Sequence, residues 1–390
     1  MQLIEVNNTA TAKDFIKVNV LMNKNNPNYI RPLDVEVNDN FNPAKNKSFR
    51  FGEAKRWILK DDNNNLVGAV AAFTNSKYIN KGTEFITGGV GFFDCIDDDK
   101  AATILFDAAK QWLQSKGAAA MDGPINFGSR DKWWGLMVEG FDKPPLYGMA
   151  YNPPYYEKLF ENYGFKNYYN QYYYVRGVKD KLQDKFFERY SKFNNKPGYE
   201  AKHISKKNLE KHAQDFATVY NAAWAQHGEA KEITLKDAMK LFDKMKVVLD
   251  ERIIWFAYYK DEPIAMWINI PDLNEYFKHF NGKFGWLQKL RLLWMKKNEQ
   301  CRIFTGIAFG VVPKYQALGI DSYMIYAASI PIQTLDWYDK YEMGWAGDWN
   351  PKMVNIYKTL GWQSRRMVTY RYIFDETQHT FERHPVMEYK

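Results

Sequence analysis

The sequence predicts an α/β (α+β) protein made of two similar halves. Apolar, strand-like runs flank polar turns in residues 56–73 and again in residues 253–270, and each pattern predicts a β-hairpin. In each half a further apolar strand and a helix follow, and an Asn-Pro helix pattern then ends at Gly164 or Gly361. This order predicts, in each half, a mixed and mostly antiparallel sheet flanked by helices.

Length and composition agree with two globular domains. The 390 residues exceed the usual size of a single core, and 46% of them are hydrophobic. We expect one domain at residues 1–180 and a second at residues 181–390. The charged stretch 179–197 joins them and is itself expected to be partly helical.

The cysteines and histidines indicate neither a disulfide nor a metal site. Cys95 and Cys301 lie far apart in predicted strands, which suits reduced core residues, and the six histidines are scattered. The N-terminus lacks the basic and apolar regions of a leader peptide, and no apolar run reaches membrane-spanning length. We expect a cytoplasmic, bacterial-type protein.

The net charge of +8 arises from 54 basic and 46 acidic residues. It favours an anionic ligand, but it fits a cofactor, a nucleic acid or a lipid surface equally well. No nucleic-acid recognition motif accompanies the charge, so nucleic-acid binding is not expected.

The stretch Val311 to Asp321 predicts a phosphate-binding turn. Residues 303–312 form an apolar strand that Pro313 ends, and a helix pattern begins after Gly319 and runs to Pro331. Amides at a helix N-terminus bind a diphosphate, and a glycine lets that group approach the backbone. Single glycines before helices are common, so this loop alone fits an ordinary turn as well.

The corresponding loop of the first half has no glycine. The predicted strand 90–96 runs into Asp97, Asp98 and Asp99, and the helix 101–116 follows. Carboxylates stabilise a helix N-terminus, so this cluster predicts a helix cap. We infer one active site per chain, in the second half, and a degenerate copy in the first.

The turn and a later helix together resemble the Gcn5-related N-acetyltransferase (GNAT) superfamily. Its members carry Val-x-Pro-x-Tyr-(Gln/Arg)-x-x-Gly-x-(Gly/Ala) at the turn and Asn-x-x-Ala-x-x-x-Tyr-x-x-x-Gly-Phe on the helix. The second pattern matches Asn350-Pro-Lys-Met353-Val-Asn-Ile-Tyr357-Lys-Thr-Leu-Gly361-Trp362. Met353 replaces Ala, and Asp321 replaces the last small residue of the first pattern. Asp321 competes with a bound phosphate for the positive field of the helix.

A closer resemblance covers nearly the whole chain and points to a largely uncharacterised bacterial tandem-GNAT family. The strings that carry it are Asp122-Gly-Pro124-Ile-Asn126, Gly135-Leu-Met-Val-Glu-Gly140-Phe141, Tyr151-Asn-Pro-Pro-Tyr-Tyr156, Tyr220-Asn221-Ala-Ala-Trp224 and Pro271-Asp-Leu-Asn274. The resemblance implies two tandem GNAT-like domains and an acyltransferase activity, without a substrate.

By this resemblance the co-substrate is acetyl-CoA or another acyl-CoA. The implied contacts are the backbone of Val311 and Val312 for the pantetheine and the thioester, and Gln316, Ala317, Leu318, Gly319, Ile320 and Asp321 around the diphosphate. Asn350 either caps the later helix or contacts the cofactor, and the two roles are compatible.

Catalysis requires an acid and a base. Tyr357 matches the family tyrosine that protonates the departing thiolate, and a phenol of pKa ~10 is protonated at neutral pH. The attacking amine must lose a proton, and the candidate bases are Glu342, Asp348 and His227. Each of the three also fits a solvated or structural residue.

Residues 276–297 carry six Lys or Arg and no Asp or Glu, interleaved with Phe, Tyr and Trp. Such a segment fits peripheral contact with an anionic membrane, or a lid over a lipid-like acyl group or acceptor. It also fits an insertion whose apolar face packs on the core.

Three functions remain open at this point. An acyl-CoA-dependent N-acyltransferase, acetylating the amine of a small-molecule or lipid-like acceptor, agrees with most observations. An aminoacyl transferase of the peptidoglycan type would not need the turn at residues 316–319. A non-catalytic acyl-CoA- or lipid-binding protein is favoured by Asp321 and disfavoured by Tyr357. The oligomeric state is open.

Overall fold

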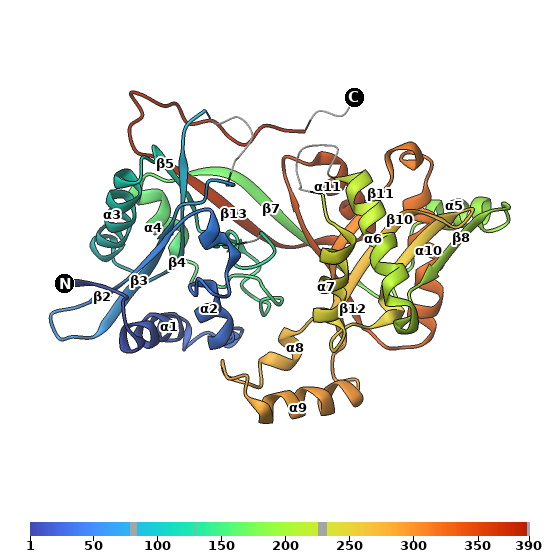
Figure 1. The fold of residues 1–390 in the computed structure, drawn as a ribbon, viewed down its shortest axis with the longest axis horizontal. Helices are drawn as coiled ribbons and strands as arrows, with labels where there is room; N and C mark the ends of the chain where they lie inside the picture. Colours follow the sequence, from blue (N-terminus) through green and yellow to red (C-terminus); the bar gives the residue numbers. More distant parts are fainter. Residues whose placement is uncertain (79–83, 129, 225–231, 388–390) are drawn as a thin grey trace.

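A computed structural model of the chain describes residues 1–78, 84–128, 130–224 and 232–387 (Figure 1). The N-terminal half contains β1 (Gln2–Glu5), α1 (Thr9–Asn23), α2 (Asp34–Asn40), β2 (Ala54–Lys60), β3 (Leu66–Phe73), β4 (Thr87–Cys95), α3 (Asp99–Ser115), β5 (Ala120–Gly123), β6 (Leu136–Glu139), α4 (Tyr156–Tyr163) and β7 (Lys166–Gly177).

The C-terminal half repeats this order and adds helices to it. It contains α5 (Asp184–Asn194), β8 (Tyr199–His203), α6 (Leu209–Ala223), α7 (Leu235–Met245), β9 (Trp255–Tyr259), β10 (Glu262–Pro271), α8 (Asn274–Phe277), α9 (Trp286–Lys297), β11 (Ile303–Val311), α10 (Ile320–Thr334), β12 (Lys340–Gly347), α11 (Pro351–Leu360) and β13 (Trp362–Ile373). The predicted repeat and the mixed, mostly antiparallel α/β architecture are confirmed.

Within the described residues, one thirteen-stranded sheet runs through both halves. Its strands follow the order β1-β2-β3-β4-β5-β13-β7-β12-β11-β10-β9-β8, and β6 pairs with β13. The last strand of each half lies in the sheet of the other half, because β13 pairs with β5 and β7 pairs with β12. At the centre β7 and β13 pair with each other, antiparallel. The two repeats therefore exchange their final strands.

The predicted division between residues 180 and 181 separates the repeats along the sequence. The hydrogen bonds of β7 and β13 cross it in space, as the central green and red strands of Figure 1 show. Strand periodicity reports which face of a strand is buried, and it does not report which neighbour the strand pairs with.

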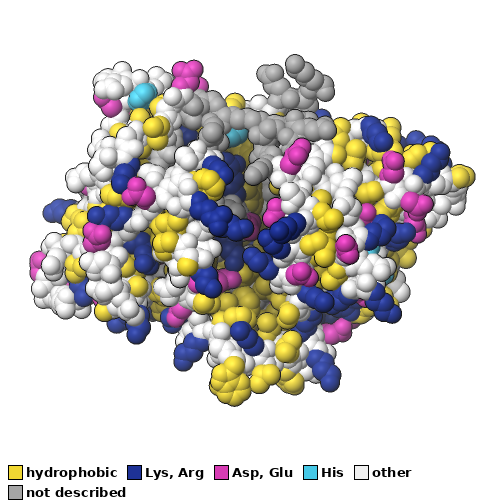
Figure 2. All heavy atoms as spheres, viewed as in Figure 1, with side chains coloured by type: hydrophobic (Ala, Val, Ile, Leu, Met, Phe, Trp, Pro, Cys, Tyr) yellow, Lys and Arg dark blue, Asp and Glu magenta, His cyan; other side chains and the backbone are white. Residues whose placement is uncertain are grey.

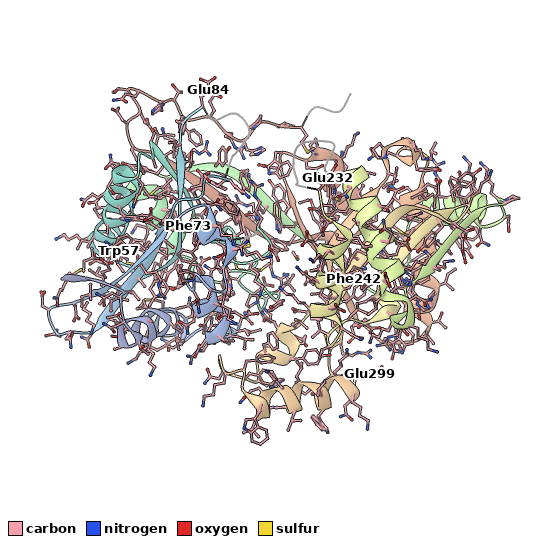
Figure 3. All side chains as sticks on the ribbon, in the orientation of Figure 1. Trp57, Phe73, Glu84, Glu232, Phe242 and Glu299 are labelled. Atoms are coloured by element: carbon pink, nitrogen blue, oxygen red, sulfur yellow. The ribbon has the colours of Figure 1, made fainter. Side chains whose placement is uncertain are left out.

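Helices cover both faces of the sheet. Along β2, Trp57 and Leu59 pack in the cluster that contains α3, whereas Ile58 packs in the cluster that contains α1, since alternate strand residues face opposite sides. In the C-terminal half α10 and α11 cover one face, and α6 and α7 cover the other, where Phe242 of α7 is buried. Figure 3 shows Trp57 in the left half of the molecule and Phe242 in the right half.

Both predicted hairpins and the elements on either side of the glycine turn are confirmed, and two details of the prediction are wrong. The helix expected to end at Pro331 continues to Thr334, because Pro331 lies in the last turn, where its missing N–H removes only one helical bond. Cys301 precedes β11 and is not in a strand. Cys95 and Cys301 are both buried and unpaired.

The segment α8–α9 lies outside the two layers, below the sheet in Figure 1, and packs against the N-terminal half. Leu33 from that half joins Phe280, Leu292 and Met295 in one apolar cluster. The amide of Asp34 donates a 2.8 Å hydrogen bond to the carbonyl oxygen of Gly282. No helix in the described ranges is long and apolar enough to cross a membrane.

Candidate active site

In each half two parallel strands pair briefly and then separate into a fork. β4 and β5 pair at residues 87–89 and 120–122, and β11 and β12 pair at residues 303–305 and 340–342. A register shift farther along β4 and along β11 marks a β-bulge in each strand. Bulges re-aim side chains and are frequent beside active sites, so both forks are candidate sites.

The C-terminal fork leads to the predicted phosphate-binding turn. Gly319 adopts a φ of +90° directly before α10, in the left-handed region that favours glycine. Within the described residues, no side chain caps the start of α10. In the N-terminal half, by contrast, the Asp98 carboxylate accepts a hydrogen bond of 2.8 Å from the amide of Ala101 at the start of α3. The predicted acidic cap is confirmed there, and only the C-terminal turn leaves its helix amides open to an anion.

A cation lies over this turn. Arg189 of α5 packs on Gly319 so closely that a Cβ on the glycine would lie 2.6 Å from Arg189 Cδ. An arginine beside a helix N-terminus strengthens the attraction for a diphosphate and offsets the carboxylate of Asp321 in the first turn of α10. Sequence analysis missed Arg189 because α5 falls in the predicted linker and carries no motif.

The other residues of the predicted turn lie together. The Gln316 side chain donates to the carbonyl oxygen of Val311 at 3.0 Å, and the amide of Val312 donates to the carbonyl oxygen of Ile264 at 2.9 Å. The first bond holds the turn against the end of β11, and the second holds that end against β10. Ala317 (φ +59°) and Leu318 are exposed on the loop, and Ile320 is buried in the core.

Tyr357 lies on α11, in the same apolar cluster as Ile320 and Met343. Its ring centroid is 5.7 Å from that of Tyr174. Burial raises the pKa of Tyr357 well above 10, so the phenol is protonated at neutral pH. Asn350 caps the same helix, because its side-chain oxygen accepts a 3.1 Å hydrogen bond from the amide of Met353. The capping role predicted for Asn350 is confirmed.

Glu342 lies at the C-terminal fork. Its strand neighbours Tyr341 and Met343 belong to the cluster of Tyr357, so the Glu342 side chain points to the opposite face of the sheet. Its carboxylate forms a buried ion pair of 2.9 Å with Arg365 of β13. This pair joins β12 to β13 across β7 and gives Glu342 a structural role.

The other two candidate bases lie elsewhere. Asp348 follows β12, and its carboxylate accepts hydrogen bonds from Asn170 (2.8 Å) and Arg383 (2.6 Å). His227 lies outside the described residues. The general-base role of Glu342, Asp348 and His227 stays a prediction.

Two buried polar atoms at the C-terminal fork lack a hydrogen-bond partner among the described residues. They are the side-chain oxygens of Asn269 and Thr305. Thr305 is the register partner of Glu342 across the fork. Buried polar atoms are almost always paired, so these oxygens mark a place where a ligand or water completes the site.

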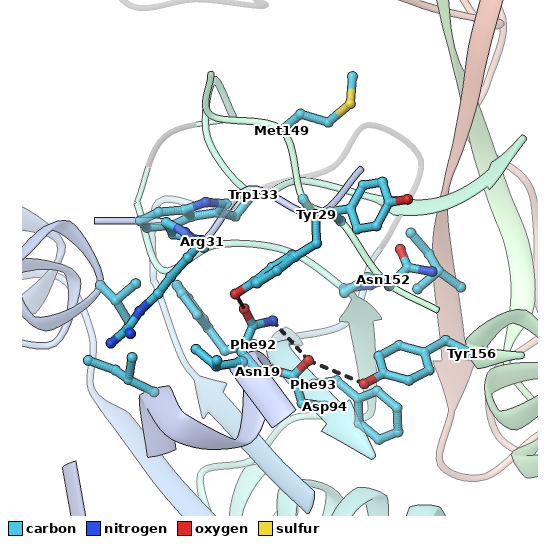
Figure 4. Close-up of a pocket in the computed structure, with 18 of the residues that line it drawn as sticks. Asn19, Tyr29, Arg31, Phe92, Phe93, Asp94, Trp133, Met149, Asn152 and Tyr156 are labelled. Atoms are coloured by element: carbon cyan, nitrogen blue, oxygen red, sulfur yellow. Dashed lines mark hydrogen bonds between the residues drawn. The ribbon is translucent and has the colours of Figure 1, made fainter. Parts of the chain in front are cut away.

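A cavity opens at the N-terminal fork (Figure 4). Its lining is mostly apolar, and includes Phe15, Val20, Phe92, Trp133, Leu136, Met149 and Tyr151. Asp94 of β4 is the one acidic residue in the lining, and it is 5% exposed.

Asp94 is held by a network of donors. Asn19 and Tyr156 donate to Asp94 Oδ1 at 2.9 and 3.2 Å, and Tyr29 donates to Asn19 Oδ1 at 2.6 Å (Figure 4). Burial raises the pKa of Asp94 to about 7, although the two hydrogen bonds favour the charged form. Sequence analysis missed Asp94, and a lone acid inside an apolar strand was the only available signal.

The end of β4 is closed by side chains. The hydroxyl of Tyr155 donates to the carbonyl oxygen of Cys95 at 2.7 Å, and the amide of Cys95 donates to the hydroxyl of Tyr156 at 2.9 Å. The backbone at the end of β11 is also paired, through the Val311 carbonyl and the Val312 amide, so pairing at the strand end does not distinguish the two halves.

No family model matches the chain. Among curated proteins, it is 25% identical to "Bacterial ceramide synthase" of Caulobacter vibrioides over 93% of this chain and 94% of that protein. It is 26% identical to "Protein YghO" of Escherichia coli over 90% of this chain and 89% of that protein.

Solved structures share the fold. A tandem GNAT protein from the clavulanic acid biosynthesis pathway matches with a TM-score of 0.53 at 11% identity, over 96% of this chain and 98% of that chain. A GNAT from Sphaerobacter thermophilus matches with a TM-score of 0.52 at 8% identity, over 96% and 95%. A fungal multi-domain protein with a GCN5-related glucosamine N-acetyltransferase region matches with a TM-score of 0.57 at 12% identity, over 95% of this chain and 38% of that chain. The chain is a tandem protein of the GNAT fold.

Proposed function

We propose that the chain is an acyl-CoA-dependent N-acyltransferase whose acyl-CoA binds at the C-terminal fork. The observation that carries this proposal is the contrast between the two helix starts. At α10 no side chain caps the amides, and Arg189, packed on Gly319, adds a positive charge. At α3, Asp98 occupies the equivalent position. A diphosphate therefore fits one helix start and is repelled from the other.

The chemistry is attack of a neutral amine on the thioester carbonyl, which forms an amide and releases the thiolate of coenzyme A. Tyr357 supplies a proton to that thiolate, for which its raised pKa keeps the phenol in the required form. The amine gives its proton to a base, directly or through water. Glu342, at the fork on the sheet face opposite Tyr357, and Asp348 are the described candidates.

We further propose that the acceptor is a long-chain amine. One relative at 25% identity is named as a ceramide synthase, and a ceramide is the amide of a fatty acid and a long-chain amino alcohol. An apolar acceptor and a long acyl group agree with the exposed apolar side chains of α9. The alternative acyl group is acetyl.

Thermal shift tests the co-substrate. A ligand at 100 times its Kd adds ~2.7 kcal/mol to the free energy of unfolding, which raises the Tm by several degrees. We expect this shift with coenzyme A and with acyl-CoAs. Gly319→Val removes it, because a Cβ collides with Arg189 and displaces it from the turn, and the left-handed φ becomes strained.

Gly117→Val is the matched control. Gly117 has a φ of +81°, and a Cβ at this position would have no neighbour within 4 Å, so the variant carries a similar backbone strain far from the turn. This variant keeps the coenzyme A shift. No shift with any coenzyme A species on the unmutated chain rules out the proposed site. Mass spectrometry of the product from an acyl-CoA and sphinganine then tests the acceptor.

A further inference from the structure

We propose that the cavity at the N-terminal fork binds the amino end of a long-chain amphiphile, with Asp94 as the counter-ion of the ammonium group. The proposal concerns a different half of the molecule from the acyl-CoA site and does not depend on acyl transfer. Its ligand class follows from the lining, which combines a large aromatic and aliphatic surface with a single carboxylate.

The carboxylate of Asp94 has one oxygen available. Both hydrogen bonds, from Asn19 and from Tyr156, go to Oδ1. Oδ2 has no hydrogen-bond partner among the described residues, and the side chain lies at the cavity wall in Figure 4. Asn19 and Tyr156 both donate to Oδ1, so the ionised carboxylate can accept a further hydrogen bond at Oδ2, which an ammonium group supplies.

The one basic residue of the lining does not compete for Asp94. The Arg31 guanidinium forms two bonds to the Asp34 carboxylate, at 3.0 Å from Nε and 2.7 Å from Nη2. Its charge is therefore matched within the loop. A free fatty acid would place its carboxylate beside Asp94 without a cation to receive it, whereas an amine completes the pair.

The pH dependence of binding follows from the groups that face Asp94. α1 contributes the uncharged Asn19, the loop before α2 contributes Tyr29 and the paired Arg31, and α4 contributes Tyr156. Burial raises the pKa of both tyrosines, so neither ionises near neutral pH. The pKa of Asp94 is about 7 without ligand. Amine binding should therefore strengthen as the pH rises from 6 to 8.

Calorimetry with dodecylamine, dodecanol and dodecanoate tests the site. We expect dodecylamine to bind more tightly than the other two, and about tenfold more weakly to Asp94→Asn at pH 8. Dodecanol binding should not change in that variant. Asp97→Asn, the same substitution at an exposed position three residues along, is the control and should bind dodecylamine as the unmutated chain does.

A photoreactive long-chain amine locates the bound probe. Labelling of peptides that contain Asp94 or residues 149–152, reduced by excess dodecylamine, supports the cavity. Equal binding of amine and alcohol, or labelling confined to other peptides, overturns the proposal. Met149→Trp fills the cavity and should weaken the binding of dodecylamine, dodecanol and dodecanoate alike. This variant separates loss of space from loss of charge.

A second inference rests on α9, and we propose that its exposed face lies on an anionic lipid bilayer. Trp286, Leu287, Leu290, Leu293 and Trp294 are each 51% to 70% exposed. Their spacing places them on one continuous stripe of the helix. Leu292 and Met295, on the other side, are buried in the cluster that fixes α9 to the protein. The helix is thus apolar on two faces, and only one is covered.

Charge decides which partner fits this face. The stripe is flanked by Lys283, Lys289, Arg291 and Lys297, and residues 276–297 contain no acid. Apolar side chains that enter the acyl boundary beside cations that meet anionic head groups are the pattern of an interfacial helix. Figure 2 shows the apolar atoms of this segment at the lower edge of the molecule, with Lys and Arg around them.

The loop that precedes α9 lies next to Arg31, which lines the N-terminal cavity. A Cβ on Gly282, in the α8–α9 loop, would lie 2.4 Å from Arg31 Nε, and Arg31 lines the cavity. A helix docked on a bilayer would therefore hold the loop at residues 29–32 near the lipid surface. This arrangement suits an amphiphile that enters from the membrane.

Vesicle sedimentation tests the second inference. We expect binding to vesicles of phosphatidylglycerol and phosphatidylcholine, little binding to pure phosphatidylcholine, and weakening by salt. Leu290→Glu with Leu293→Glu should abolish binding, and Ile330→Glu, at an exposed apolar position of α10, should not. Absence of vesicle binding overturns the inference. Self-association that the double variant abolishes, without vesicle binding, would assign the stripe to a second copy of the chain.

Discussion

Burial controls the ionisation of Tyr357 in the C-terminal half and of Asp94 at the N-terminal fork. Desolvation disfavours the charged form of any group, so it keeps the phenol of Tyr357 protonated and raises the pKa of the Asp94 carboxyl to about 7. The same cause therefore leaves Tyr357 as a neutral phenol in the C-terminal half. At the N-terminal fork it gives a carboxylate that gains or loses its charge near neutral pH.

The role of Tyr357 as proton donor is tested by Tyr357→Phe. Removing one hydroxyl should lower kcat for acyl transfer by about 100-fold or more, because the thiolate then leaves without its proton. The coenzyme A thermal shift should persist, since the phenol does not hold the diphosphate. Tyr174→Phe, on the neighbouring ring, is the control. Full activity of Tyr357→Phe would exclude the role.

Asp94 gives a pH-dependent stability. Its pKa rises from 3.8 in the unfolded chain to about 7 in the fold, so the folded state holds more protons between these values. The free energy of unfolding should fall as the pH rises from about 4 to about 7. Burial also raises the pKa of Asp272 to about 7, so Asp272 likewise lowers the free energy of unfolding as the pH rises.

Asp94→Asn removes the fall in stability that ionisation of Asp94 causes, and it keeps a side-chain oxygen that accepts from Asn19 and Tyr156. Urea unfolding should show the variant to be more stable than the unmutated chain by about 1–3 kcal/mol at pH 8. At pH 4 the two should be nearly equal. A stability difference that is the same at both pH values would contradict the assigned pKa.

Among the elements, the junction of β5 and β13 depends on a buried ion pair. Arg371 of β13 donates to both oxygens of Asp122 in β5, at 2.6 and 2.8 Å, and its guanidinium lies 3.7 Å from the ring centroid of Tyr168. Tyr78 also donates to Asp122 at 2.8 Å. Because β5 has only four residues, few backbone hydrogen bonds join it to β13.

Arg371→Met should lower the free energy of unfolding by about 3–5 kcal/mol, because it removes the guanidinium that binds both oxygens of the buried Asp122. Adding Asp122→Asn should recover part of that loss. Lys166→Met removes an exposed pair with Glu376, in the turn after β13, and should cost less than about 1 kcal/mol. Equal losses in denaturant unfolding for both single variants would show that burial of the Asp122 pair has no effect.

For the whole molecule, the exchange of β7 and β13 ties the halves into one sheet. Without β13 the N-terminal half would expose the edge of β5, and without β7 the C-terminal half would expose the edge of β12. Unpaired edges favour aggregation. Neither half is expected to fold correctly alone.

Splitting the chain tests this interdependence. Fragments 1–196 and 197–390, divided at an exposed turn, should co-purify as an equimolar complex when expressed together with a tag on one of them. Either fragment expressed alone should aggregate. Two fragments that are each monodisperse and folded would contradict a stabilising strand exchange.

Prediction from the sequence worked where the information is local. Both hairpins, the strand 303–311 and the turn at Gly319 follow from periodicity and from glycine and proline positions over a few residues. The cap at Asn350 is likewise a short-range pattern. Arg189, Asp94 and the partner of Glu342 could not be found in this way, since each depends on a neighbour distant in the chain.

By itself, the sequence determined the two repeats, their elements and an open helix start in the second repeat only, because these depend on residues within a few turns of one another. Only the tertiary structure decided that β7 and β13 change places, that Arg189 covers Gly319 and that Asp94 faces an apolar cavity. A strand's pairing partner and the surroundings of a buried charge are set by segments distant in the chain, which local patterns do not specify.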